Sequence, residues 1–207
     1  MATDVDICNL ALSHIGDVSN IQSVSPPDGS AQAAHCARFY PVARDALIES
    51  HNWSFAVKYL QLAELTNDRT EWDYKYGLPA DMLNAISIAS LGQTDDTSVA
   101  TGGVPQPFSI EADAAGNLVL YTDIETAVLR YTRKDISAGV FPPLFVMALS
   151  WKLGALLAGP VVRGEAGTAA AKHCEGMAAM YQNNAKIADS NKRQVKVEHI
   201  PTWIANR

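Results

Sequence analysis

The sequence has few of the features that mark disulfide-stabilised or nucleotide-binding proteins. Only three cysteines occur, Cys8, Cys36 and Cys174, and none belongs to a CxxC pair. A small, odd number of cysteines favours buried free thiols in a reducing compartment over a disulfide framework. The glycines form neither GxGxxG nor GxxxxGKS/T, which argues against a nucleotide-binding loop. The sequence holds no zinc-type ligand cluster, so we expect neither a metal nor a cofactor.

Long uninterrupted hydrophobic runs are also absent. The most apolar window, residues 140–162, contains Lys152 and is bracketed or broken by Pro142, Pro143, Gly159 and Pro160. Its unbroken part has about 15 residues, fewer than the roughly 20 that a membrane span requires. We therefore predict a buried helix here and no membrane association. The first residues are acidic and helical rather than basic and then apolar, so we expect no signal peptide.

The composition is that of a packed globular chain. It has 207 residues, of which 48% are hydrophobic and 18% charged, enough to bury a core without disulfides. The net charge of −6 argues against a cationic nucleic-acid binder. The charge is uneven, because residues 190–207 hold four basic residues and one acidic residue, a net +3, which leaves −9 for the rest.

Helical patterns occupy both ends of the chain. Thr3-x-x-Asp6 is typical of a capping box, Gly16 of a helix stop, and Ser30 of an N-cap for a helix over 31–51. We expect Pro41 to kink that helix. Pro142-Pro143 suits a helix start, and the all-round apolar stretch 145–158 predicts a central helix that Gly159-Pro160 ends. A last helix is predicted over residues 165–189.

The middle of the chain has the alternating pattern of strands. A helical interpretation of residues 55–62 is nearly as good as a strand. Residues 93–107 are rich in Gly, Thr, Asp and Pro and predict a mobile loop. We expect four or five antiparallel strands, drawn from residues 55–60, 74–78, 86–91, 108–110, 118–121 and 127–133.

The predicted fold class is therefore α+β: mainly a helical bundle of about four helices, with a small antiparallel β insertion and an extended C-terminal tail. The predicted domains are 1–53 with 141–189 for the bundle, 54–140 for the β-rich insertion, and 190–207 for the tail. The tail is apolar and basic without helical periodicity, so it either packs on its own body or docks on another chain.

The residues present no recognisable catalytic constellation, and we expect no enzymatic activity. The alternative is a glycan or cell-wall hydrolase that uses carboxylates near Trp53 and Trp72, because such enzymes need one protonated and one ionised carboxyl group. No spacing selects a pair from these acids. The aromatics form either a ligand platform or, as we favour, core or subunit interface. The acids are Asp45, Glu49, Glu71, Asp73 and Asp81, and the aromatics are Trp53, Trp72, Tyr74 and Tyr76.

Three stretches together resemble the head-to-tail adaptor proteins of tailed bacteriophages, most closely the tail tubular protein A type. These stretches are Leu10-Ala-Leu-x-x-Ile15-Gly16, then Ala43-Arg44-Asp45-x-Leu47-Ile-x-x-His51-x-Trp53-x-Phe55-Ala56, and then Tyr74-x-Tyr76-x-Leu78-Pro79-x-Asp81.

The resemblance implies a helical bundle with a β insertion and a structural virion protein, made in the host cytoplasm and located at the head–tail junction. It implies a homo-oligomeric ring, a dodecamer in the virion, between the portal protein and the downstream tail or nozzle protein. DNA would pass through the ring without sequence-specific binding, which suits an acidic wall. Some family members have been credited with glycan hydrolysis, which nothing in this sequence independently supports. A small homodimeric binding module is a third hypothesis.

In the resembled family the C-terminal segment reaches toward the portal. We therefore expect the tail to supply the partner-binding residues, with an apolar set for docking and a basic set for steering toward an acidic partner. The apolar set is Val197, Ile200, Trp203 and Ile204, and the basic set is Lys192, Arg193 and Lys196.

Overall fold

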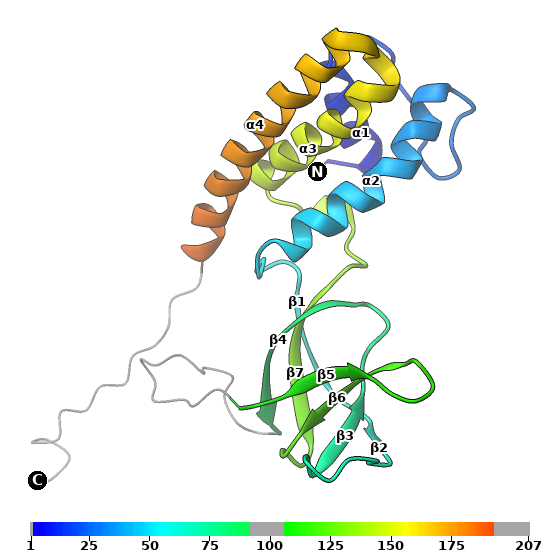
Figure 1. Cartoon of the computed structure of the whole chain (residues 1–207). Coiled ribbons are helices and arrows are strands. Elements are labelled where there is room, and N and C mark those ends of the chain that lie inside the picture. The colour runs from blue at the N-terminus through cyan, green and yellow to red at the C-terminus, as the bar shows by residue number, and fades with distance from the viewer. Residues whose placement is uncertain (1, 92–105, 193–207) are drawn as a thin grey trace, which may run out of the picture. The chain divides into compact units, whose positions relative to one another are not determined.

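The computed structural model describes residues 2–91 and 106–192, which form two compact units (Figure 1). The helical unit contains residues up to Ala56 and residues Lys134–Lys192, and the β unit contains Val57–Arg133. The described residues form four α-helices and two antiparallel sheets. The predicted α+β class is confirmed at this level, although the chain is not a pure helical bundle.

The helical unit is built around its most apolar helix. Helix α3 (Pro143–Val162) packs against α1 (Asp4–His14), α2 (Ala31–Glu49) and α4 (Gly164–Ser190). A short 3₁₀ helix, η2 (Ala138–Val140), precedes α3. Helix α3 is long enough and apolar enough to cross a membrane, but the core helix of a folded protein can be so too. Half of its apolar window is buried within the protein. This burial agrees with the predicted central helix.

Local hydrogen bonds at the helix starts explain why the sequence located them well. The Thr3 side chain accepts from the Asp6 backbone, and the Asp6 carboxylate accepts from the Thr3 backbone, which is the predicted capping box. The Ser30 hydroxyl accepts from the Ala33 backbone at 3.1 Å and caps α2. Each cap satisfies backbone donors that a helix start would otherwise leave unpaired.

The predicted end of α3 at Gly159-Pro160 is wrong, because the helix continues through Pro160 to Val162. Proline normally crowds the residue before it, and glycine has no Cβ to be crowded. Gly159 therefore removes part of the steric cost. Pro160 lies in the last turn, so its missing N–H costs at most one hydrogen bond near the end of the helix. Arg163, at φ +60°, then turns the chain into α4.

Helix α4 runs beside α3 (Figure 1), and small residues allow the two backbones to approach each other. A Cβ built at Gly167 would lie 2.9 Å from the Ala158 carbonyl oxygen of α3. A Cβ at Gly154 of α3 would lie 3.3 Å from the Ala11 carbonyl oxygen of α1. At Gly167 the absence of a Cβ thus lets the backbones of α3 and α4 come into contact.

The β unit contains a three-stranded sheet, ordered β1-β7-β4, and a four-stranded sheet, ordered β2-β3-β6-β5. All described pairs are antiparallel. A buried cluster that includes Tyr76, Leu120, Leu129 and Tyr131 forms its core. The strands are β1 (Val57–Gln61), β2 (Glu64–Leu65), β3 (Tyr74–Gly77), β4 (Met82–Ser90), β5 (Ser109–Ala112), β6 (Leu118–Thr122) and β7 (Ala127–Arg133).

The prediction of four or five strands is wrong, since the described part of the chain has seven. Strand β2 has only two residues, too few to show an alternating pattern. Strand β4 begins at Met82, earlier than predicted, and its register shifts between Met82 and Asn84 and again between Ala85 and Ser87. Such irregularities interrupt the two-residue period, so only the regular end of β4 is visible in the sequence. The predicted loop over 93–107 lies almost wholly outside the described residues.

Candidate functional site

The predicted partner-binding residues belong to the tail, and most of them lie outside the described residues. These are Arg193, Lys196, Val197, Ile200, Trp203 and Ile204. Lys192 is the last described residue, and its Nζ lies 3.3 Å from Asp189 Oδ1. The candidate site is therefore built from the residues of the helical unit that surround the end of α4, where the tail begins.

A buried carboxylate, Asp189, organises this end of α4. Its side chain is 5% exposed and accepts hydrogen bonds from the Ser54 backbone at 2.8 Å and the Ser54 hydroxyl at 2.6 Å. His51 Nε2 lies 3.7 Å from Asp189 Oδ2. The loop after α2 is thereby fixed to the last turn of α4, although the two are more than 130 residues apart in sequence.

The protonation states of this cluster follow from burial and hydrogen bonding. Burial by itself would raise the pKa of Asp189, but hydrogen bonds from Ser54 and Lys192 outweigh it and hold that pKa below its usual value. Burial lowers the pKa of His51, and the nearby Asp189 charge offsets this only in part. At neutral pH Asp189 is therefore ionised and His51 is neutral.

Sequence reasoning missed Asp189, although one signal was available. A negative charge in the last turn of a helix opposes the helix dipole, so it needs hydrogen-bond donors from elsewhere. Ser54 supplies them, and it lies within the stretch His51-x-Trp53-x-Phe55 that carries part of the resemblance.

An apolar hollow of about 220 Å³ opens beside this cluster. Trp53 is held in its wall by a hydrogen bond from Nε1 to the Leu47 carbonyl oxygen at 2.8 Å, and by edge contact with Phe145 at a centroid separation of 5.0 Å. The hollow can accept apolar side chains but offers little polar chemistry. Its lining consists of Trp53, Pro142, Pro143, Leu144, Phe145, Ala185, Ala188, Asp189 and Lys192.

A second, larger hollow of about 780 Å³ lies in the helical unit beside the start of α1. Tyr40, in its wall, donates to Asp4 Oδ1 at 2.7 Å, and the Arg44 guanidinium stands 6.0 Å from the centre of the Tyr40 ring. Tyr40 and Asp4 are thus paired with each other, and Arg44 pairs with Asp45 at 2.8 Å. No group of three or more metal-ligand side chains within residues 2–91 and 106–192 is placed to hold an ion.

The residues of the hydrolase alternative do not form one site within either unit. Trp53, Asp45 and Glu49 belong to the helical unit, whereas Trp72 and the other three acids belong to the β unit. Asp81 accepts from Lys58 Nζ and from the Tyr131 hydroxyl, each at 3.0 Å. Although burial opposes it, these two bonds lower the pKa of Asp81, so this carboxyl group is held ionised.

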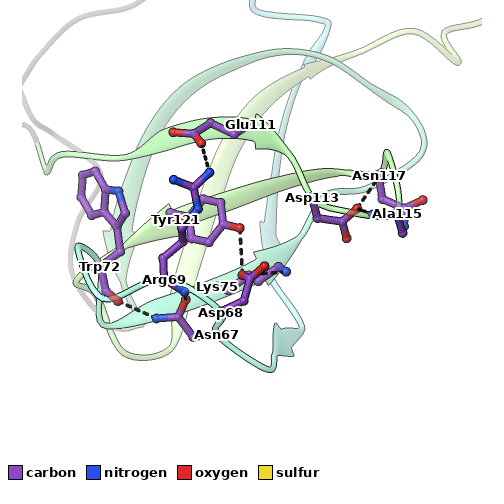
Figure 2. Close-up of polar contacts among 10 residues, drawn as sticks. All are labelled: Asn67, Asp68, Arg69, Trp72, Lys75, Glu111, Asp113, Ala115, Asn117 and Tyr121. Carbon is purple, nitrogen blue, oxygen red and sulfur yellow. Dashed lines mark hydrogen bonds and ion pairs between the residues drawn. The ribbon is translucent and has the colours of Figure 1, made fainter.

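Figure 2 shows paired polar side chains of the β unit, with Trp72 held at one side by the Asn67 amide, which donates to the Trp72 carbonyl oxygen. Asp68 accepts from Lys75 Nζ and the Tyr121 hydroxyl, each at 3.0 Å, and Arg69 Nη2 donates to Glu111 at 2.6 Å. Lys75 and Tyr121 lower the pKa of Asp68. Among the described carboxyl groups with a shifted pKa, every shift is downward. A glycosidase acid needs the opposite shift.

The residues that carry the resemblance have structural roles in the described part of the chain. Gly16 adopts φ +81° just after α1, Trp53 is 1% exposed, and the Tyr76 hydroxyl donates to the Ile124 carbonyl oxygen at 2.8 Å. No family model and no curated protein matches the chain. The functional proposal therefore rests on this arrangement and on the resemblance.

Proposed function

We propose that this chain is a structural virion protein, a head-to-tail adaptor that forms an oligomeric ring between the portal and the tail. The observation that carries the proposal is the layout of the chain. Two helices, an inserted β unit and two further helices follow one another, and the three resembling stretches fall in α1, at the exit from α2 and in the β unit. This is the layout that the resemblance implies.

In the proposed assembly the four helices are the bundle that forms the body of each subunit, and the tail that follows α4 carries the portal-binding residues. The tail binds the portal through Val197, Ile200, Trp203 and Ile204, while Arg193 and Lys196 steer it toward an acidic surface. Lys192 shares this steering role less fully, since it also pairs with Asp189 of its own chain. Apolar contacts inside a polar rim are the usual basis of such an interface.

The proposed ring lines the DNA exit channel and performs no chemistry. The residues before the tail carry a net charge of −9. A wall of negative charge repels phosphate groups, so DNA slides through it without binding. The same charge makes the basic tail distinct from the body, which favours its use in docking rather than in lining the channel.

Light scattering at several protein concentrations, with and without purified portal protein, tests the proposal. A ring-sized species, formed alone or only with the portal, is the expected result. A small dimer whose mass is independent of concentration and of added portal would overturn it. Such a dimer would direct attention to polysaccharide-hydrolysis assays, with Glu71→Gln and Asp81→Asn as the variants.

Deletion of residues 191–207 tests the role of the tail. The expected result is a chain that retains the fold of the body and loses portal binding. A truncated chain that binds the portal as tightly as the full chain would contradict the assignment of the docking residues.

A further inference from the structure

Within the described part of the chain, the hollow beside Asp189 is an apolar surface that no side chain fills, at a fixed place on the helical unit. Trp53 and Phe145, at its base, are 1% and 0% exposed and belong to the core, so the accessible apolar atoms of the hollow are those of Pro142, Pro143, Leu144 and Ala188. Apolar lining atoms without contact partners forfeit dispersion energy and do not retain water well. An occupant that brings an apolar side chain would regain those contacts.

The size of the hollow restricts the occupant. A dry cavity of about 150 Å³ lined by apolar side chains can bind benzene. The hollow here, at about 220 Å³, therefore has room for one branched aliphatic or aromatic side chain, but not for a helix. A short extended segment that presents a single side chain fits it best.

The segment that follows α4 begins at the edge of this hollow. Lys192 lines the hollow and is the last described residue. Its backbone N–H donates to the Asp189 carbonyl oxygen at 3.0 Å, and that of Asn191 donates to the Ile187 carbonyl oxygen at 3.2 Å. Together with the contact between Lys192 Nζ and Asp189, these bonds fix the chain beside the hollow as it leaves α4.

We propose that the first part of the tail, residues 193–195 of the same chain, folds back so that Val195 fills this hollow. Three residues span at most about 10 Å, so Val195 can reach the hollow directly and cannot move far from it. This self-docking goes beyond the adaptor function and does not require a ring or a portal. It restricts the first residues of the tail and leaves Val197, Ile200, Trp203 and Ile204 available for a partner.

The test is a cysteine cross-link in the full chain. Ala188 lines the hollow and is exposed, so the double variant Ala188→Cys/Val195→Cys places one thiol in the hollow and one at its proposed occupant. The matched control is Ile187→Cys/Val195→Cys, because Ile187 is the exposed neighbour of Ala188 on α4 and does not line the hollow. The described native thiols are buried.

Both variants are oxidised with glutathione disulfide, which accepts the two electrons as the two thiols lose their protons and join. Products are separated on a non-reducing gel, and peptide mass identifies the linked residues. A disulfide requires Cβ atoms about 3.5–4.5 Å apart. The expected result is an intrachain link that forms at least tenfold faster in the Ala188 variant than in the Ile187 variant.

Two results would overturn the proposal. Equal rates in the two variants would mean that Val195 does not reside in the hollow. Predominant covalent dimers in the Ala188 variant would mean that the tail of a second copy occupies it. Neither result depends on the portal, so failure of this proposal is distinguishable from failure of the adaptor function.

Discussion

Trp53 contacts residues that are far from it in the sequence and stabilises the helical unit through them. Its ring meets Phe145 of α3 and His51 of the preceding loop, and its Nε1 donates to the Leu47 carbonyl oxygen at the end of α2. Ser54, the next residue, supplies two hydrogen bonds to Asp189 of α4. Two adjacent residues thus join α2, α3 and α4.

Replacement of Trp53 measures how much this side chain stabilises the helical unit. Trp53→Ala should lower the free energy of unfolding by about 3–5 kcal/mol, because a large aromatic side chain leaves a cavity. Trp53→Phe should cost less, since the ring contacts remain in part and Ser50 Oγ still donates to the Leu47 carbonyl oxygen at 2.7 Å. Urea unfolding followed by circular dichroism gives both values. Equal losses for the two variants would contradict the importance of ring packing.

Asp28 and Ser30 provide a prediction about pH. Hydrogen bonds from the Ser30 hydroxyl and from the backbones of Gln22 and Ser30 lower the pKa of Asp28 to about 2. Because the folded pKa lies below the ordinary 3.8, the stability that this carboxylate contributes is complete above pH 3.8 and is lost as pH falls toward 2.

Carbon-13 titration of the carboxyl groups checks this directly. In the parent chain the Asp28 signal should titrate near pH 2, and in Ser30→Ala its midpoint should rise toward 3.8. Ser30→Ala also removes the cap of α2 and should lower the free energy of unfolding by about 1 kcal/mol. An unchanged Asp28 midpoint in the variant would show that the hydroxyl does not set the pKa.

At the scale of elements, the places where two helices approach each other closely fix how the helices of this unit pack. Helix α3 is apolar on nearly every side, so its surface does not select one partner. Glycines instead fix where the helices meet, since at Gly154 and Gly167 the backbone atoms of two adjacent helices come into contact.

Two glycines of α4 make a matched pair. Gly167→Ala places a Cβ 2.9 Å from a backbone oxygen of α3, so it should destabilise the protein by about 1–3 kcal/mol. Gly176→Ala, with nothing within 4 Å of the new Cβ, should stabilise it by about 0.8–1 kcal/mol through helix propensity. Thermal and urea unfolding measure both. A stabilising Gly167→Ala would mean that α3 and α4 separate at little cost.

At the scale of the whole molecule, the two units have independent cores and the proposed function concerns how copies of the chain assemble. Exposed apolar side chains are the natural candidates for subunit contacts. Met180 and Ile187 on α4 are 45% and 64% exposed and are seven residues apart, which places them on one face of the helix.

The double variant Met180→Glu/Ile187→Glu should weaken ring formation in light scattering with portal, while the unfolding free energy changes by no more than about 0.5 kcal/mol. Val18→Glu is the control, because Val18 is 95% exposed but lies in a loop of the same unit. Normal assembly of the double variant would assign the subunit contact to another face.

Much of the secondary structure was predictable because local patterns specify it. The hairpin of β5 and β6 follows from alternation on either side of a turn in which Asp113 accepts from the backbones of Ala115 and Asn117. Strand β2 and the start of β4 were not predictable, since one is too short and the other irregular. For the candidate site, the sequence identified Trp53 and Lys192 but neither Asp189 nor the hollow.

The sequence by itself determined where α1 and α2 begin, that α3 is buried, and that a β-rich segment interrupts the helices. These features depend on residues within a few positions of one another, through caps and periodicity. Only the tertiary structure decided that Asp189 is buried yet ionised and that an apolar hollow lies where the tail begins. Each of these depends on contacts between distant segments, whose hydrogen bonds and packing outweigh local preference.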